Sequence, residues 1–192
     1  MYSLLYFIYL FILALLLALL EVQIEGKYGW AKNLPTWRPH THKWYARLYG
    51  KIMSGKELTG YHAAMFSFVL MLMHFPFVVG VAWSWQGELW VLSVFFLFDI
   101  LWDFLWFIVN PHYGLNKFES SYIAWHKKWI GPMPMDYIGG IVVSFIILLP
   151  TMLFGGVMLG AWAYIILLWT LLLFVVTLIG LIGKTIKIVF NR

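Results

Sequence analysis

Long apolar runs constrain the fold of this chain more than any other feature of its sequence. A helix needs about 20 apolar residues to cross about 30 Å of hydrocarbon. Runs that meet or approach this length occupy residues 2–22, 62–83, 88–109, 137–154 and 159–182. They predict one membrane domain over residues 1–192: an all-α integral membrane protein with five transmembrane helices.

The composition indicates the same class of protein. Hydrophobic residues make up 63% of the chain and charged residues 11%, whereas soluble proteins have roughly 45–50% and about 25%. The chain contains no cysteine, which excludes disulfide scaffolds, thiolate metal sites and cysteine nucleophiles. The first apolar run lacks a preceding basic region and a small-residue cleavage site, so we expect a retained helix rather than a signal peptide.

Basic residues alternate between the connecting segments and predict the orientation of the chain. Seven lysines and arginines lie in residues 23–61, three in residues 110–136 and three after residue 182, and these are all 13. Because basic segments face the cytoplasm, we expect the N-terminus outside and the C-terminus in the cytoplasm. The net charge of +5 then predicts anionic lipid headgroups, rather than nucleic acid, as partners.

The two long basic segments are predicted to contain interfacial amphipathic helices. A lysine or arginine recurs every four residues from Lys43 to Lys51, beside an arc of aromatic and aliphatic residues. A solvated helix that only caps the bundle is the alternative. Residues 29–39, rich in tryptophan and turn formers, predict a covering loop. In the second segment Asn116 is expected to cap a short helix that runs to Trp129.

Three strings in these segments resemble a known family. They are EGKYGWAKNLPTWR, WDFLWFIVNPHYG and WHKKWIGPMPMDY, and they are similar to a family of small polytopic prokaryotic membrane proteins that is uncharacterised in activity. The resemblance covers residues 21–140. It implies a multi-pass protein of the cytoplasmic (inner) membrane of a prokaryote, and it brings no activity, cofactor or substrate with it.

Ionisable side chains inside the apolar runs are the most informative residues about function. A central aspartate costs roughly 2.5–3.5 kcal/mol on insertion scales, so such residues face the bundle interior. Asp99 and Asp103 share one face of the third run, and Glu88 and Asn110 fall on the same stripe. His74 in the second run reaches a similar depth to Asp99, which predicts a contact between them.

Acids and histidines also gather at the cytoplasmic ends of the runs. Carboxylates and imidazoles from several helices suit a divalent metal or di-iron site, and equally general acid–base chemistry. No Glu-x-x-His pair specifies one metal. The predicted metal ligands are Glu21, Glu25, His62, Asp103, His112 and His126. The predicted catalytic residues are Asp103, His62, Asp99 and His74, and the predicted substrate contacts are Trp37, Trp44, Asn110 and Trp125.

Each of these residues also has a purely structural interpretation. Polar side chains such as Asp99 can bridge helices, and His74 can be a core histidine bound to a backbone carbonyl. Glu21 and Glu25 can pair with nearby lysines at the interface. His126, which lies between a tryptophan and a lysine, can be an interfacial residue rather than a ligand.

Motifs exclude several membrane enzymes and leave three functions open. The six histidines are scattered rather than gathered in the boxes of desaturases, and no Walker loop or Gly-x-Ser-x-Gly elbow is present. The first function is a small membrane-embedded enzyme acting on a lipidic or hydrophobic substrate at the cytoplasmic interface, with a divalent metal as candidate cofactor. The second is a non-catalytic subunit or assembly factor that binds a protein partner or another copy. The third is a proton or ion pathway.

Overall fold

A computed structural model describes residues 3–154 and 157–190. In these two ranges the chain is mostly helical, with long loops and one small hairpin. The elements are α1 (Leu4–Glu25), α2 (Trp44–Ile52), α3 (Gly60–Val78), α4 (Trp85–Val109), η1 (Leu115–Lys117), β1 (Trp129–Ile130), β2 (Met133–Pro134), α5 (Met135–Leu148), η2 (Leu149–Phe154) and α6 (Val157–Phe190).

Four helices are long and apolar enough to cross a membrane, namely α1, α3, α4 and residues 158–181 of α6. This confirms the predicted class of a helical protein with several membrane-spanning helices. The fifth predicted span, residues 137–154, differs, because its α-helical part is the shorter α5. Pro150 lies just beyond that helix. It has no N–H to continue the α-helical ladder, and the chain switches to the 3₁₀ turns of η2.

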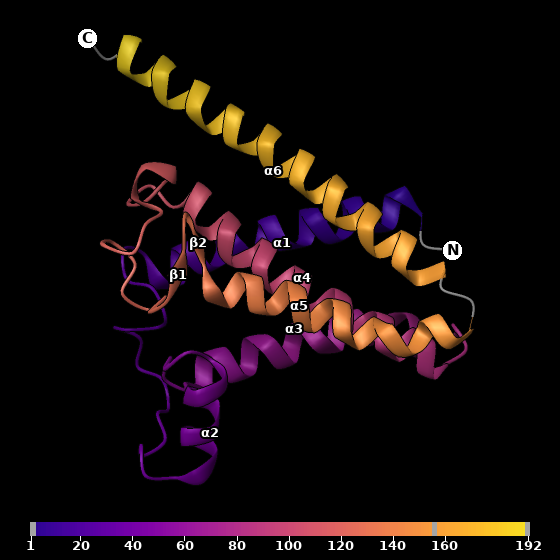
Figure 1. Ribbon diagram of the computed structural model, residues 1–192. Helices are drawn as coiled ribbons and strands as arrows, with labels where there is room; N and C mark the ends of the chain where they lie inside the picture. Colours follow the sequence, from indigo (N-terminus) through magenta and orange to yellow (C-terminus); the bar gives the residue numbers. More distant parts are fainter. Residues whose placement is uncertain (1–2, 155–156, 191–192) are drawn as a thin grey trace.

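Helix α4 lies at the centre of the bundle and packs on α1 and α5, with α6 and α3 at its sides. Several of its side chains, Trp90, Val94, Phe98 and Leu105 among them, are fully buried. Figure 1 shows α2, the hairpin and the long loops gathered at one end of the bundle, and the short α3–α4 connection at the other. Helix α6 crosses the bundle diagonally, and its C-terminal half diverges from the other helices.

The connection between α3 and α4 lies earlier in the chain than predicted. The Ser84 side chain accepts the Gly87 N–H at 3.1 Å and caps α4. Helix α4 therefore begins at Trp85 rather than at residue 88, and α3 ends at Val78 rather than at residue 83. The predicted runs 62–83 and 88–109, which leave residues 84–87 as the connection, are wrong at this point, because Ser84 caps the helix instead.

The predicted helix between Asn116 and Trp129 is also wrong. The described chain forms only η1 there, followed by a loop and the antiparallel β1–β2 hairpin, in which Trp129 pairs with Pro134. Gly131 turns the hairpin with a φ of +57°, a conformation that glycine adopts at no steric cost. The Trp125 ring stacks on Phe107, with the ring centroids 5.8 Å apart and 9° between the ring planes. Tertiary contacts thus override a weak local helix signal.

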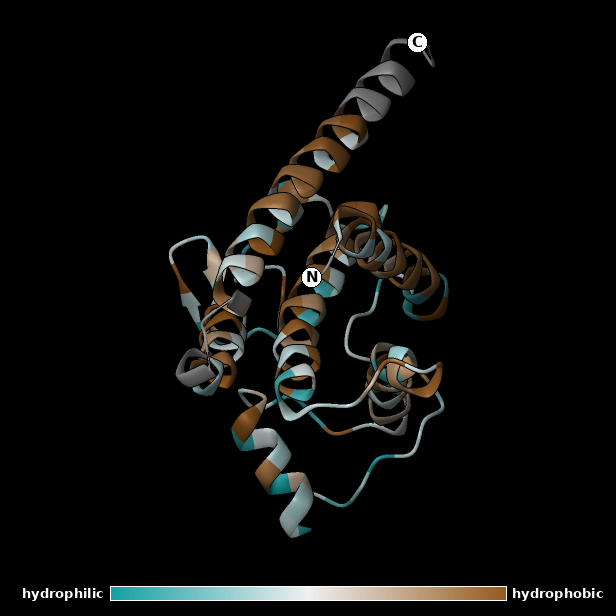
Figure 2. Ribbon diagram, turned by 90° about the vertical axis from the view of Figure 1, so that its right-hand side faces the viewer, coloured by the Kyte–Doolittle hydropathy of each residue, from teal (hydrophilic) through white to brown (hydrophobic). Residues whose placement is uncertain are grey.

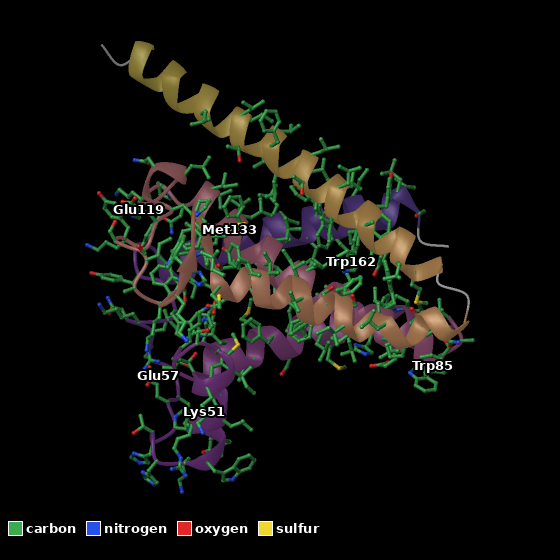
Figure 3. All side chains as sticks on the ribbon, in the orientation of Figure 1. Lys51, Glu57, Trp85, Glu119, Met133 and Trp162 are labelled. Carbon is green, nitrogen blue, oxygen red and sulfur yellow. The ribbon has the colours of Figure 1, made fainter. Side chains whose placement is uncertain are left out.

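The basic segments lie together at one end of the molecule. The labelled side chains of Lys51, Glu57 and Glu119 lie at that end and Trp85 at the opposite end (Figure 3). Helix α2 forms where predicted, buries none of its residues, and mixes polar and apolar residues, whereas α6 is mostly apolar (Figure 2). The position of α2 in a membrane interface and the orientation of the chain stay predictions. The predicted turn at residues 155–156 and Arg192 lie outside the described residues.

Candidate functional site

Three buried side chains form a compact group where α1 ends and α3 begins. Glu21, Glu25 and His62 each offer one ligand atom, and these atoms all lie within 4.8 Å of one another. Nε2 of His62 is 3.9 Å from Oε1 of Glu25. Two atoms bound to one ion at about 2.0–2.2 Å can lie up to about 4.4 Å apart, so this group, the buried triad, is close to ligating geometry.

Each member of the buried triad is held by a neighbouring group. Thr59 Oγ1 lies 2.8 Å from Nδ1 of the histidine, which leaves Nε2 toward the carboxylates. The Tyr61 hydroxyl donates to Oε1 of Glu21 at 3.2 Å, and the Ala31 N–H donates to Oε1 of Glu25. Metal ligands in proteins are oriented by such outer partners, so the triad has the support that a metal site requires.

A cavity of about 30 Å³ adjoins the buried triad. Besides the triad it is lined by Asp99 and Asp103 from α4 and by four tryptophans, and by no lysine or arginine. The alternative in which Glu21 and Glu25 pair with lysines is wrong for the described residues, none of which forms such a pair. Buried carboxylates without a cation are costly, so this cavity favours a cation.

Trp30 covers the triad, and no prediction from the sequence singled it out. Its ring stacks on His62 with centroids 4.0 Å apart. Its Nε1–H donates to the carbonyl of Glu57 at 2.7 Å, and the Lys56 ammonium lies 4.5 Å from the ring centroid. Trp30 has a φ of +57°, which costs a non-glycine residue of order 1–3 kcal/mol. The contacts offset this cost, and the loop of residues 29–39 thereby closes over the triad.

His126 lies beside the cavity between two carboxylates. Its Nε2 is 3.0 Å from Oδ2 of Asp103, and its Nδ1 is 3.1 Å from Oδ2 of Asp136. The Tyr137 hydroxyl donates to the same Asp103 oxygen at 2.5 Å, and Lys56 Nζ lies 3.2 Å from Asp136. His126 is 2% exposed, so the interpretation as an interfacial residue is wrong. We call these five residues the His126 network.

The charge of His126 follows from these neighbours. Burial alone lowers its pKa, but the negative charge of Asp103 and the hydrogen bonds to Asp103 and Asp136 outweigh burial and raise the pKa above its ordinary value. Both ring nitrogens donate when the ring is protonated, which fits a carboxylate on each side. The network therefore holds a proton next to the triad cavity.

The predicted contact between His74 and Asp99 is wrong. His74 Nε2 lies 2.9 Å from Oε1 of Glu88, and its Nδ1 lies 2.7 Å from the carbonyl of Leu70, as the structural alternative required. Because α4 begins at Trp85, Glu88 rather than Asp99 reaches the level of His74. His74 is thus at the far end of the bundle from the buried triad.

The other predicted site residues are scattered. His112 is exposed and lies outside the buried triad. Asn110 is buried, but its amide donates to a carbonyl at the end of α1 at 2.8 Å, and its Oδ1 accepts the His112 N–H, which is a structural role. Trp37 and Trp44 are 57% and 69% exposed and line neither cavity described here, whereas Trp125 lines the triad cavity.

A larger cleft of about 300 Å³ opens beside the triad cavity and shares Asp99 and Asp103 with it. Asp99 makes no hydrogen bond with another residue in the ranges that the structure describes. The cleft is lined at its polar end by the His126 network and along its length by apolar residues of α3, α4 and α5. The sequence signal for this grouping was only the Asp99–Asp103 face of α4.

No family model matches this chain, and no curated protein or solved structure is significantly similar to it. Three features of the structure bear on the function of the chain. These are the buried triad, the His126 network and the cleft that joins them.

Proposed function

We propose that this chain is a small membrane-embedded enzyme that binds a divalent metal ion and acts on a lipidic substrate at the cytoplasmic membrane interface. The buried triad carries the proposal: its two carboxylates and one imidazole lie within 4.8 Å of one another and face a cavity that is also lined by Asp99 and Asp103 and by no lysine or arginine. Oxygen and imidazole ligands in this combination suit hard and borderline divalent ions. The basic segments at this end of the bundle support its cytoplasmic placement.

The residues around the triad supply the remaining parts of an enzyme site. When bound, a divalent ion activates a carbonyl, phosphoryl or water oxygen as a Lewis acid. Asp103 receives hydrogen bonds from Tyr137 and His126 on its Oδ2 alone, so its Oδ1 can accept a proton from a substrate or water. His126, held protonated, can return a proton to a leaving group. Paired groups of this kind perform general acid–base catalysis.

The geometry weighs against a proton pathway through the bundle. Such a pathway needs His74 to connect Glu88 with Asp99, but His74 contacts only the first of these acids. Eleven residues of α4 separate Glu88 from Asp99, a distance of about 16 Å at 1.5 Å per residue. The His74–Glu88 pair and Asp99 therefore lie at different depths in the bundle.

The first test is metal stoichiometry. We expect the purified protein to bind one divalent ion per chain in equilibrium dialysis, and Glu25→Gln, which keeps the shape of the side chain, to lose it. Glu119→Gln is the matched control, because Glu119 is an exposed acid outside the triad. Sub-stoichiometric binding by the native chain, or unchanged binding by Glu25→Gln, would contradict the metal site. Metal-dependent conversion of a lipid from a total lipid extract, followed by mass spectrometry, tests the enzyme itself; no conversion in the metal-loaded protein contradicts it.

The second test concerns Thr59, which orients His62 through Nδ1. Outer-shell substitutions lower metal affinity by about 10–100-fold, and we expect this loss for Thr59→Val. Thr59 also caps α3, so the variant loses about 1 kcal/mol of stability, which thermal unfolding measures separately. Thr59→Ser retains the hydroxyl and should bind metal like the native chain. Equal affinity of the Val and Ser variants would show that Thr59 has no part in metal binding.

A further inference from the structure

The cleft has an apolar arm that runs along the bundle away from the buried triad. Phe96 and Ile100 of α4 and Val143 of α5 line this arm, and Phe66 of α3 lines both the cleft and the triad cavity. Seven residues separate Phe96 from Asp103 on α4, which corresponds to about 10 Å. That length is about two-thirds of one leaflet of a bilayer whose hydrocarbon is about 30 Å thick. The arm is therefore deep enough for about two-thirds of a hydrocarbon chain that spans one leaflet.

Two adjacent glycines of α5 shape the apolar arm. A Cβ added at Gly140 would lie 2.8 Å from Cδ1 of Ile100, so this glycine lets α5 pack closely on α4. A Cβ added at Gly139 meets nothing within 4 Å, so this glycine leaves the cleft open. The Ser93 hydroxyl, which donates to the Ser144 carbonyl at 2.9 Å, ties the two helices together beyond the arm.

An opening of the cleft between α3 and α5 would face hydrocarbon. Helices α3 and α4 are long and apolar enough to span a membrane, and α3 packs chiefly on α4. Figure 1 shows α3 and α5 running alongside α4 over the same part of the bundle. A ligand that enters between them therefore comes from the bilayer, and the volume of about 300 Å³ is at the small end of the range for ligand pockets, roughly 300–1,000 Å³.

The polar end of the cleft has more acidic than basic side chains. Asp99, Asp103 and Asp136 line it, against the two cations Lys56 and His126. Both cations already contact Asp136, and His126 also contacts Asp103, whereas Asp99 has no hydrogen-bond partner among the described residues. An unpaired acid at this position attracts a group that donates hydrogen bonds, and it repels an anionic one.

We propose that the cleft binds one single-chain amphiphile that enters sideways from the bilayer, with its hydrocarbon chain along Phe96 and Val143 and an amine or hydroxyl headgroup at Asp99. This inference rests on the proposed function and names its substrate class. The headgroup then lies at Asp103, beside the triad cavity, where the chemistry is proposed to occur.

The test uses a long-chain alkylamine that carries a photo-activated group in its chain, incorporated in nanodiscs with the full-length protein. We expect labelling of the apolar arm, and we expect Gly139→Leu to reduce it by about ten- to a hundredfold, because the new side chain overpacks the cleft. Gly160→Leu on α6 is the matched control, since a Cβ there also meets nothing within 4 Å. Equal labelling of the two variants overturns the proposal.

Competition and metal binding separate the parts of this inference. An unlabelled alkylamine or alcohol should compete better than an alkyl phosphate of equal length, and the reverse order overturns the headgroup assignment. Asp99→Asn should weaken this preference over the alkyl phosphate, which also keeps the proposal testable if Gly139→Leu does not fold. If the protein binds no metal but the arm is still labelled, the cleft is supported and the proposed function is contradicted. If the protein binds metal but the arm is not labelled, the proposed function stands and the cleft is contradicted.

Discussion

Replacing His126 by alanine is expected to lower the free energy of unfolding by about 3 kcal/mol. Removal of one partner from a buried ion pair costs about 3–5 kcal/mol, because the remaining charge is left unpaired. The lower end applies because the side chains of Asp103 and Asp136 keep 28% and 20% of their exposure. Thermal or denaturant unfolding in detergent measures the loss. A change below about 1 kcal/mol, the value of an exposed pair, would contradict the network.

Because of His126, we also expect the free energy of unfolding to fall as pH rises. The folded pKa of His126 is raised above the unfolded value of about 6.5. Its contribution is therefore complete below about pH 6.5 and is lost as pH rises through the folded pKa. His126→Gln keeps hydrogen-bonding groups but does not titrate, so its stability should change less over this window. Parallel pH profiles for the two proteins would show that His126 is not the titrating group.

Asp103→Asn is expected to lower lipid conversion by about 10²–10⁴-fold, the usual contribution of a general acid or base. The amide keeps the shape of the side chain, but it cannot take up a proton. Its metal binding should stay close to that of the native chain, because the buried triad is unchanged. Conversion of the lipid identified in the extract, measured with metal-loaded proteoliposomes, gives the comparison.

Tyr137→Phe is the companion variant for this prediction. It removes the hydroxyl that donates to Oδ2 of Asp103 at 2.5 Å but leaves the carboxylate. We expect a smaller loss of conversion and an altered pH profile, since Tyr137 positions the acid through a hydrogen bond and does not itself take up the proton. Full conversion by Asp103→Asn would remove Asp103 from the catalytic assignment, whatever the result for Tyr137→Phe.

The sequence predicted the parts of this molecule that depend on length and helical spacing. The membrane-spanning helices follow from apolar runs. Glu21 and Glu25 are four residues apart, so they share one face of α1. His62 opens the next apolar run, which places it at the same end of the bundle. Helical spacing and chain direction therefore predict that these three of the six candidate metal ligands lie at the same end of the bundle.

The same reasoning did not predict the conformations of the loops. Residues 116–129 show a local helix signal, yet their conformation is set by His126 reaching Asp103 on α4 and Asp136 on α5. Trp30 adopts a left-handed backbone that no sequence pattern favours for tryptophan. The predicted contact rested on depths counted from the cytoplasmic ends of the two runs, whereas His74 lies near the end of α3 and contacts Glu88 near the start of α4. Such errors arise because tertiary contacts, not periodicity, decide loop geometry.

The order of residues along the chain has a consequence for biogenesis. The buried triad needs only α1 and the first turn of α3, so its last member, His62, leaves the ribosome long before Asp103, His126 and Asp136. The three residues of the buried triad can therefore come together while α4 is still being inserted, before the two aspartates of α4 pack beside them. The His126 network is completed later, when α5 docks on α4.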